Sequence, residues 1–249
     1  MSVYYNEIDP FAAAWLRALI RRGLIAPGDV DERSIADVRA DDLVRYDQCH
    51  FFAGVGGWSL ALRLAGWPDD RPVWTGSCPC QPFSGAGRGL GTADARHLWP
   101  DFARLIRERA PGIVFGEQVD GPDGRAWLDG VHADVETAGY AFGAASLCAA
   151  GAGAPHVRQR LYWVAAHAGS VGASGRIEAG RSGEVRPGGA PRPVDLREVC
   201  CGPYVAGAGH PQPLLRTTHD GVSGRVGRLR GYGNAIDPNL AAMFIAAAA

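Results

Sequence analysis

The sequence predicts an α/β fold built on one mostly parallel sheet. Short apolar segments rich in β-branched and aromatic residues alternate with longer segments whose apolar residues recur at helical spacing. Glycine or proline separates most of these segments, as in successive strand–helix–strand units. With 249 residues, 47% of them apolar and 20% charged, the chain is long enough for one large domain with a substantial core.

The expected elements follow in a regular order. Strands are expected at residues 3–5, 48–53, 72–76, 113–115 and 161–165. Helices are expected at residues 10–22, 59–65, 98–109, 126–138 and 238–249. Pro10 and Gly23 mark the start and the stop of the first helix. In the third helix Leu98, Phe102 and Leu105 share one face, which indicates that this face packs on the sheet.

Residues 168–212 differ from the rest of the chain. They are rich in Gly, Pro, Ser and Arg and show little apolar periodicity, so we expect a small, loop-rich, separately organised module or a partly disordered segment. We assign residues 167–230 to this region, beside a main domain formed by residues 1–166 and 231–249. Residues 1–150 hold 14 Arg and 20 Asp or Glu, a net charge of −6, whereas residues 151–249 hold 11 Arg and 6 Asp or Glu, a net charge of +5. This asymmetry suits a polyanionic partner, although a solvated surface would explain it equally well.

The composition also limits the compartment and the kinds of site. No apolar run approaches the roughly 18 residues of a membrane span, and the N-terminus lacks the pattern of a secretory signal, so we expect a cytoplasmic protein without membrane contact. The six cysteines form no C-x-x-C pair, which argues against a zinc site or a disulfide framework. We therefore expect no metal.

Five short segments carry residues suited to chemistry. They are Phe52-Ala-Gly-Val-Gly-Gly57, Ser77-Cys-Pro-Cys80-Gln-Pro-Phe-Ser84, Phe115-Gly-Glu117-Gln-Val119, Pro155-His-Val-Arg158-Gln-Arg160 and Gly233-Asn234-Ala-Ile236. The glycines let a ligand approach the backbone, although a plain turn is the alternative. Cys80 and Glu117 each follow a strand, at the sheet edge where α/β active sites form. Arg158 and Arg160 alternate, so both project from one face of an extended segment, which suits a phosphate or a pyrimidine carbonyl.

In this order the segments resemble the motifs of cytosine-5 DNA methyltransferases, and the short format resembles compact phage-type members. The resemblance implies a Rossmann-like, adenosylmethionine-dependent methyltransferase fold, S-adenosyl-L-methionine as the methyl donor and double-stranded DNA as the substrate. It makes Cys80 the nucleophile that adds to C6 of a flipped-out cytosine. Glu117 would hydrogen-bond N3 and the exocyclic amine, and Arg158 and Arg160 would hold the carbonyl oxygen and order the nucleophile loop.

The resemblance also assigns binding residues. For the cofactor they are Phe52, Ala53, Gly54, Val55, Gly56, Gly57, Trp58, Pro79, Leu98, Asn234 and Ala235. For DNA they are Gln81, Ser84 and Arg88 in the nucleophile loop, and Arg225, Arg228 and Arg230 in a basic run whose alternative is a flexible linker. The region at 167–230 stands where the family has its target-recognition region, and its small size predicts a short or relaxed target sequence.

The layout departs from the family in one respect. Only 23 residues separate Gly57 from Cys80, too few for the two units that carry the ribose and adenine contacts. Equivalent residues occur at the N-terminus, where Glu7 with Ile8 would contact the ribose and Asp29 with Val30 the adenine. We therefore hypothesise a circular permutation, which requires Glu7 to lie within about two hydrogen-bond lengths of the glycine loop. A second departure is Gln118, where the family has Asn.

Several alternatives stay open on the sequence alone. They are an enzyme of the same family that acts on RNA, one that uses a modified donor, and a catalytically silent DNA-binding scaffold. A cognate restriction endonuclease is a further partner to consider, and we expect a monomer.

Overall fold

The computed structural model describes residues 2–79, 98–154, 157–167 and 235–248. Its centre is a seven-stranded sheet with the strand order β2-β1-β3-β4-β5-β7-β6. The strands are β1 (Val3–Asn6), β2 (Gly28–Asp31), β3 (Gln48–Phe51), β4 (Val73–Gly76), β5 (Ile113–Val119), β6 (Tyr140–Cys148) and β7 (Gln159–His167). The first five strands pair in parallel, and β7 pairs antiparallel with both β5 and β6. The predicted α/β fold with a mostly parallel sheet is confirmed.

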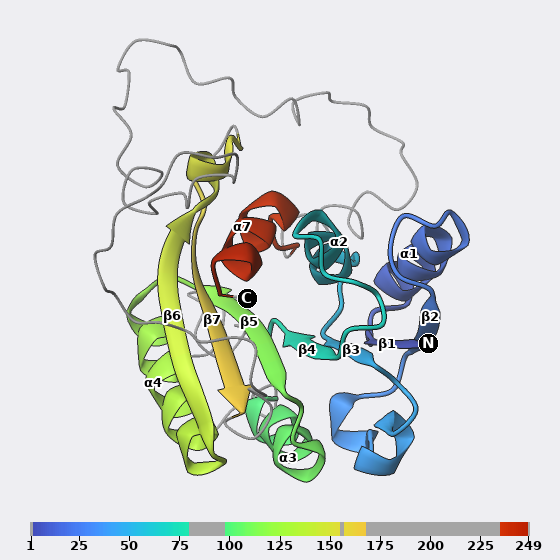
Figure 1. Cartoon of the computed structure of the whole chain (residues 1–249), viewed down its shortest axis with the longest axis horizontal. Helices are drawn as coiled ribbons and strands as arrows, with labels where there is room; N and C mark the ends of the chain where they lie inside the picture. Colours follow the sequence, from blue (N-terminus) through green and yellow to red (C-terminus); the bar gives the residue numbers. More distant parts are fainter. Residues whose placement is uncertain (1, 80–97, 155–156, 168–234, 249) are drawn as a thin grey trace, which may run out of the picture.

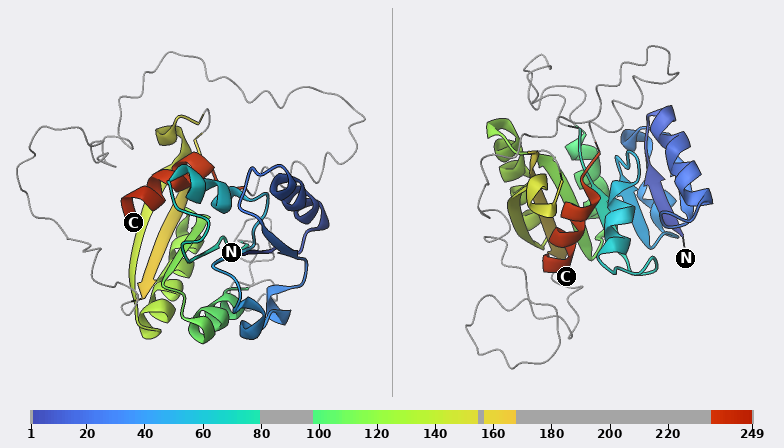
Figure 2. Two further views of the ribbon diagram at one scale, coloured as in Figure 1. Left: turned by 45° about the vertical axis from the view of Figure 1, so that its right-hand side comes forward. Right: turned by 90° about the horizontal axis from the view of Figure 1, so that it is seen from above.

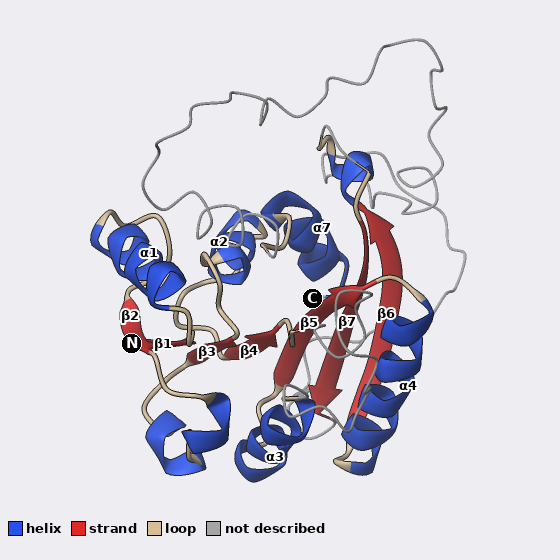
Figure 3. Cartoon of the chain, turned by 180° about the vertical axis from the view of Figure 1, so that it is seen from behind, coloured by secondary structure: helices blue, strands red, loops and turns tan. Residues whose placement is uncertain are grey.

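Helices cover both faces of this sheet (Figures 1 and 3). They are α1 (Pro10–Arg21), α2 (Gly57–Leu64), α3 (Trp99–Arg109), α4 (Pro122–Thr137) and α7 (Pro238–Ala248). On one face, α2 packs against α7 with α1 beside them, and on the other face α3 packs against α4 and against two short 3₁₀ turns, Ile35–Asp37 and Ala40–Leu43. The two further views in Figure 2 show the same layers.

The helix ends follow from local chemistry. Asp9 caps α1, because its side chain accepts hydrogen bonds from the backbone N–H groups of Phe11 and Ala12, and Pro10 occupies the first turn, where no N–H partner is needed. Helix α3 buries Phe102, Leu105 and Ile106 completely or almost so, as its periodicity predicts. Its C-cap, Ala110, takes a left-handed conformation with φ 45°, which ends the helix before Pro111.

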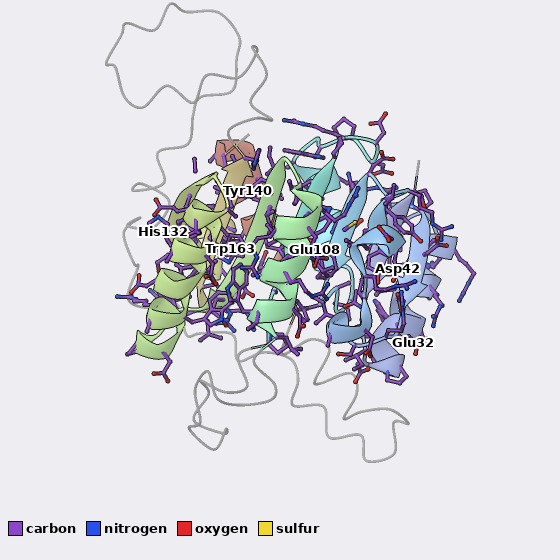
Figure 4. All side chains as sticks on the ribbon, turned by 90° about the horizontal axis from the view of Figure 1, so that it is seen from below. Glu32, Asp42, Glu108, His132, Tyr140 and Trp163 are labelled. Atoms are coloured by element: carbon purple, nitrogen blue, oxygen red, sulfur yellow. The ribbon has the colours of Figure 1, made fainter. Side chains whose placement is uncertain are left out.

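Close packing ties the antiparallel half of the sheet to α3 and α4. Trp163 of β7 is fully buried, and it lies between α3 and α4 in Figure 4. Its ring stands edge-on to Trp99 at 6.0 Å, and its indole occupies the space that a Cβ on Gly116 would take. Glycine is therefore required at position 116, one residue before Glu117.

The strand register decides which residues meet at the carboxyl edge. Asn6 pairs with Phe51, Phe51 with Gly76, and Gly76 with Gly116. The residues that come next along the four strands therefore stand side by side at one edge: Glu7, Phe52, Ser77 and Glu117.

Three elements differ from the expectation. Residues 28–31 form the edge strand β2 and residues 140–148 form the other edge strand, β6, although no strand was expected at either place. Both lack a strong strand pattern, because Gly, Asp and Ala predominate, and pairing with a neighbour holds them in place. β5 runs to Val119 instead of ending at 115, so Glu117 lies inside the strand, opposite Tyr162 of β7. Among the described residues, no helix combines the length and apolar character needed to cross a membrane.

Candidate functional site

A cavity of about 700 Å³ opens at the carboxyl edge of the parallel strands. It brings together most of the described residues that the sequence assigned to a site: Glu7, Ile8, Phe52, Ala53, Gly54, Val55, Gly57, Trp58, Pro79, Leu98, Glu117, Arg158, Arg160 and Ala235. The strands that carry these residues are far apart in sequence, so the register described above, and not proximity along the chain, assembles the site.

At one end of the cavity, the glycine loop meets Glu7. Phe52 has a φ of 53°, a region that non-glycine residues rarely adopt, and Gly54 and Gly56 also have positive φ values. This sharp turn directs the backbone N–H of Gly54 at Glu7, whose Oε2 accepts it at 2.7 Å. Glu7 Oε1 accepts the N–H of Asp9 at 2.9 Å. The distance required by the permutation hypothesis is therefore met for Glu7.

The Glu7 carboxylate is held by backbone groups. Burial raises the pKa of Glu7, and the two backbone hydrogen bonds oppose that rise. Each carboxylate oxygen has two acceptor directions and uses one of them on the backbone. The second direction of each oxygen is available to a ligand with hydroxyl donors.

At the other end of the cavity, Glu117 is almost fully buried and faces two arginines. Arg160 Nε approaches Glu117 Oε1 to 2.8 Å, as an ion pair. Oε1 nevertheless has no hydrogen bond of good geometry within the described part of the chain. Burial raises the pKa of Glu117, and the positive charges of Arg160 and Arg158 and a hydrogen bond from Ser77 oppose that rise only in part. A carboxyl with a raised pKa beside a cavity is suited to donating a proton.

The two arginines contact different partners. Arg160 pairs with Glu117, whereas Arg158 donates from Nη2 to the backbone oxygen of Ala235 at 2.9 Å. Next to Ala235, Ile236 packs so closely on Gly57 that a Cβ there would lie 2.7 Å from its Cγ1. Arg158 and Gly57 thus attach the segment before α7 to the cavity, a structural role that the sequence did not distinguish from ligand binding.

Three assigned residues do not line the cavity. Asp29 lies within β2, away from its carboxyl end, and its Oδ2 accepts hydrogen bonds from Arg45 at 3.1 Å and from Tyr46 at 2.8 Å. Val30 lies beside it on the same strand. The structure therefore does not bring Asp29 and Val30 to the cavity, because residues 28–31 form a strand and the chain reaches the carboxyl edge only afterwards. Gly56 caps α2 and packs against Ile25 instead of facing the cavity.

Other lining residues had been given no binding or catalytic role from the sequence: Asn6, Arg33, Ser34, Ile35, Ser77, Cys78 and Gln118. Residues 33–35 follow β2, and treating 28–31 as a strand would have placed them at the edge. Gln118 is buried; its Oε1 accepts the N–H of Val119 at 2.9 Å, and its Nε2 lies 3.5 Å from the Cys78 carbonyl, the limit for a hydrogen bond. Its extra methylene relative to Asn is thus accommodated without a strong bond to the nucleophile loop.

Several assignments lie outside the described residues. They are Cys80, Gln81, Ser84, Arg88, Arg225, Arg228, Arg230 and Asn234, together with the region at 168–230 that was expected to form a separate unit. Pro79 and Leu98, which flank the first of these stretches, both line the cavity.

The comparisons with known proteins all point to DNA methyltransferases. Residues 67–180, which include Cys80, Glu117, Arg158 and Arg160, match the family model of the C-5 cytosine-specific DNA methylases. Type II methyltransferase M.HhaI of Haemophilus parahaemolyticus is 34% identical over 175 residues, with 55% of this chain and 51% of that protein covered. Type II methyltransferase M.NgoMIV of Neisseria gonorrhoeae is 34% identical over 162 residues, with 49% of this chain and 52% of that protein covered. The chain thus spans about half the length of these curated relatives.

Among solved structures, a mutant of Spodoptera frugiperda DNMT2 superposes on this chain with a TM-score of 0.46 at 16% sequence identity. The superposition covers 70% of this chain and 45% of the DNMT2 chain.

Proposed function

We propose that the chain belongs to the family of C-5 cytosine-specific DNA methylases, whose model matches residues 67–180, and that it is a DNA (cytosine-5-)-methyltransferase that methylates C5 of cytosine in duplex DNA. The observation that carries this proposal is the pairing of two buried or half-buried carboxylates in one cavity. Glu7 is held by the glycine loop at one end, and Glu117 is held by Arg160 at the other. Such a cavity suits a donor with ribose hydroxyls and an acceptor base.

The donor end fits S-adenosyl-L-methionine, which supplies an electrophilic methyl group when bound. Glu7 keeps one acceptor direction on each oxygen for the two ribose hydroxyls. Helix α2 begins at Gly57 without a side-chain cap, so its first N–H groups are available to the amino-acid carboxylate of the donor. On the remaining side, residues 33–35 take the adenine role expected of Asp29 and Val30, since they line the cavity and those two do not.

The acceptor end fits a flipped-out cytosine. Protonated Glu117 donates to N3 and accepts the exocyclic amine with Oε1, the oxygen that has no well-directed hydrogen bond. Arg160 donates to O2 of the base while it holds Glu117. Each contact withdraws electron density from the ring, and so makes C6 more electrophilic.

Cys80 completes the chemistry. Its thiolate adds to C6 while Glu117 protonates N3, and the resulting enamine makes C5 nucleophilic. After C5 has been alkylated, a base removes the C5 proton, the C6–S bond breaks and the thiolate leaves with its electron pair, and N3 returns its proton to Glu117. Cys80 would be placed for this attack by Pro79, which lines the cavity directly before it.

The order of the strands supports the permutation as part of the proposal. β1, which carries Glu7, comes first in the chain yet pairs with β3, which carries the glycine loop. β4, which leads to Cys80, pairs with the other side of β3 after a single crossover through α2. The donor end is thus built from segments on either side of β3, with the ribose contact before the glycine loop in sequence. We further include a cognate restriction endonuclease as a cellular partner, because the relatives are named Type II methyltransferases.

The direct test is incubation of the full chain with unmodified duplex DNA and S-adenosyl-L-methionine, followed by mass spectrometry of the digested nucleosides. We expect deoxycytidine to gain one methyl group. The gain should disappear in Cys80→Ser and persist in the matched control Cys148→Ser, a free thiol at the end of β6. Methylation only of RNA would replace DNA with RNA as the substrate, and DNA binding without any transfer would reduce the protein to a binding scaffold.

A further inference from the structure

Ser77 lies between the cofactor loop and the buried glutamate. It is the first residue after β4 and follows Gly76, which pairs with Gly116, so Ser77 and Glu117 stand side by side on neighbouring strands. The Ser77 hydroxyl lowers the pKa of the Glu117 carboxyl. Trp58 Nε1 donates to Ser77 Oγ at 3.0 Å. All three residues line the same cavity. Trp58 and Ser77 therefore connect α2, which follows the glycine loop, to the surroundings of Glu117.

The direction of this chain is set by the indole. A Trp N–H can only donate, so Ser77 Oγ must act as the acceptor toward Trp58. The hydroxyl proton of Ser77 is then free to point at Glu117, and the carboxylate is the acceptor. A serine without such a neighbour would rotate between several partners, whereas Trp58 holds this one as a donor to Glu117.

Trp58 is itself rigidly placed. It is only 4% exposed, and its ring stacks on Phe115 at 6.2 Å and meets Tyr162 edge-on at 6.1 Å. Phe115 lies two residues before Glu117 on β5, and Tyr162 lies opposite Glu117 in the register of β7. The strands that carry Glu117 and Arg160 therefore also hold the Trp58 indole, which orients Ser77, in a fixed position.

We propose that Ser77 is a positioning residue for Glu117, and that Trp58 orients its hydroxyl so that the carboxyl is held facing the target base. This inference rests on the proposed function, in which Glu117 contacts the cytosine. It adds a residue that acts through Glu117, and it connects the helix of the glycine loop to the catalytic acid.

The charges around Glu117 determine the sign of the test. Arg160 and Arg158 at the start of β7 favour the ionised carboxylate; Tyr162, whose pKa burial raises, and Asp237 lie near the same arginines. The Ser77 hydroxyl also favours the ionised form of Glu117, since it donates to the carboxylate. Removing that hydroxyl must raise the pKa of Glu117 further.

The first experiment titrates Glu117 directly. The full chain is labelled with ¹³C at the glutamate carboxyl carbons, Glu117→Gln assigns the resonance, and the pKa is read by NMR without donor or DNA. We expect Ser77→Ala to raise this pKa and Ser77→Thr to restore it. Trp58→Phe should shift it in the same direction by less. The matched control is Trp67→Phe, an equally buried indole that donates to the Arg71 carbonyl at 3.0 Å on the same face; it should leave the pKa unchanged.

The second experiment measures the pH dependence of kcat for methyl transfer. In Ser77→Ala, kcat should fall about tenfold, the effect of one lost hydrogen bond, while KM for the donor stays within about twofold. The alkaline limb should move to higher pH, because the protonated form of Glu117 persists longer. A pKa of Glu117 that is identical in Ser77→Ala and wild type, or a Thr variant as impaired as Ala, overturns the inference. Absence of methylation by the wild-type chain would overturn the proposed function and leave the titration interpretable.

Discussion

The two ends of the cavity use the same functional group in opposite surroundings. Glu7 and Glu117 both stand at the carboxyl edge of the sheet, and burial raises the pKa of both. Glu7 is held by two backbone N–H groups, those of Asp9 and Gly54. Glu117 is held by side chains, an ion pair with Arg160 and a hydrogen bond from Ser77.

In the proposed function, this difference separates recognition of the donor from proton transfer to the base. Backbone donors are positioned by the chain trace itself, so the donor end depends on the glycine loop keeping its turn. Side-chain donors depend on residue identity and carry charge, so the acceptor end can adjust the proton affinity of Glu117. Substitutions around Glu117 should therefore change rate and pH dependence, whereas substitutions of Glu7 should change affinity for the donor.

The largest effect is expected for Glu117→Gln. Gln cannot supply a proton to N3, so kcat should fall by about 10²- to 10⁴-fold, with donor affinity unchanged. Single-turnover kinetics and isothermal titration with S-adenosyl-L-methionine measure the two quantities. Glu108→Gln, an exposed glutamate on α3 paired with Arg104, is the control and should behave as wild type. Equal loss of rate and donor affinity in Glu117→Gln would contradict the division between the two ends.

Glu7→Gln should weaken donor binding by about ten- to a hundredfold, because hydrogen bonds to a charged acceptor become bonds to a neutral one. The rate at saturating donor should change far less. Isothermal titration calorimetry measures the affinity, with Glu32→Gln as the control, since Glu32 makes an exposed ion pair with Arg17 outside this cavity. A large fall in kcat with unchanged affinity for the donor would contradict the assignment of Glu7 to the ribose hydroxyls.

His50, in the middle of β3 between the two ends, should limit acid stability. Burial lowers its pKa from 6.5 to about 3, so the folded state resists protonation. The free energy of unfolding should therefore be greatest above pH 6.5 and should decrease as the pH falls toward 3. At pH 5 it should be lower by about 2 kcal/mol than at neutral pH. Urea unfolding at pH 8 and pH 5 measures the difference in the free energy of unfolding between the two pH values. We expect this difference to be smaller in His50→Gln than in wild type, and unchanged in His132→Gln, because His132 is a partly exposed histidine on α4.

The smallest effect is expected for Arg158→Gln. Loss of its bond to the Ala235 carbonyl should loosen the start of α7 by about 1 kcal/mol. Hydrogen exchange of the α7 amides should then become about fivefold faster, while that of α4 stays unchanged as the internal reference. An unchanged α7 together with a large loss of catalysis would return Arg158 to the base-binding role that the sequence suggested.

The sequence by itself determined the fold class and most of the residues that line the Glu7 end of the cavity. Strand and helix periodicity are local properties, and a glycine-rich turn between a buried strand and a helix is recognisable without knowledge of its surroundings. Glu7 was also found from the sequence, because its neighbourhood resembles a motif that the chain lacks after the glycine loop. The resemblance to a known set of motifs also assigned Glu117, Arg158 and Arg160 to one site, and all three line the same cavity.

Only the tertiary structure decided the rest. Edge strands β2 and β6 are specified by pairing with distant segments, and because β2 was not expected, the sequence pointed to Asp29 and not to residues 33–35, which line the cavity. The separate contacts of Arg158 and Arg160, two residues apart, depend on Ala235 and Glu117, each more than 40 positions away. The connection from Trp58 through Ser77 to Glu117 likewise joins a helix, a strand end and the interior of another strand. Hydrogen bonds between such distant residues leave no periodic trace in a sequence, since their partners meet only when the sheet has formed.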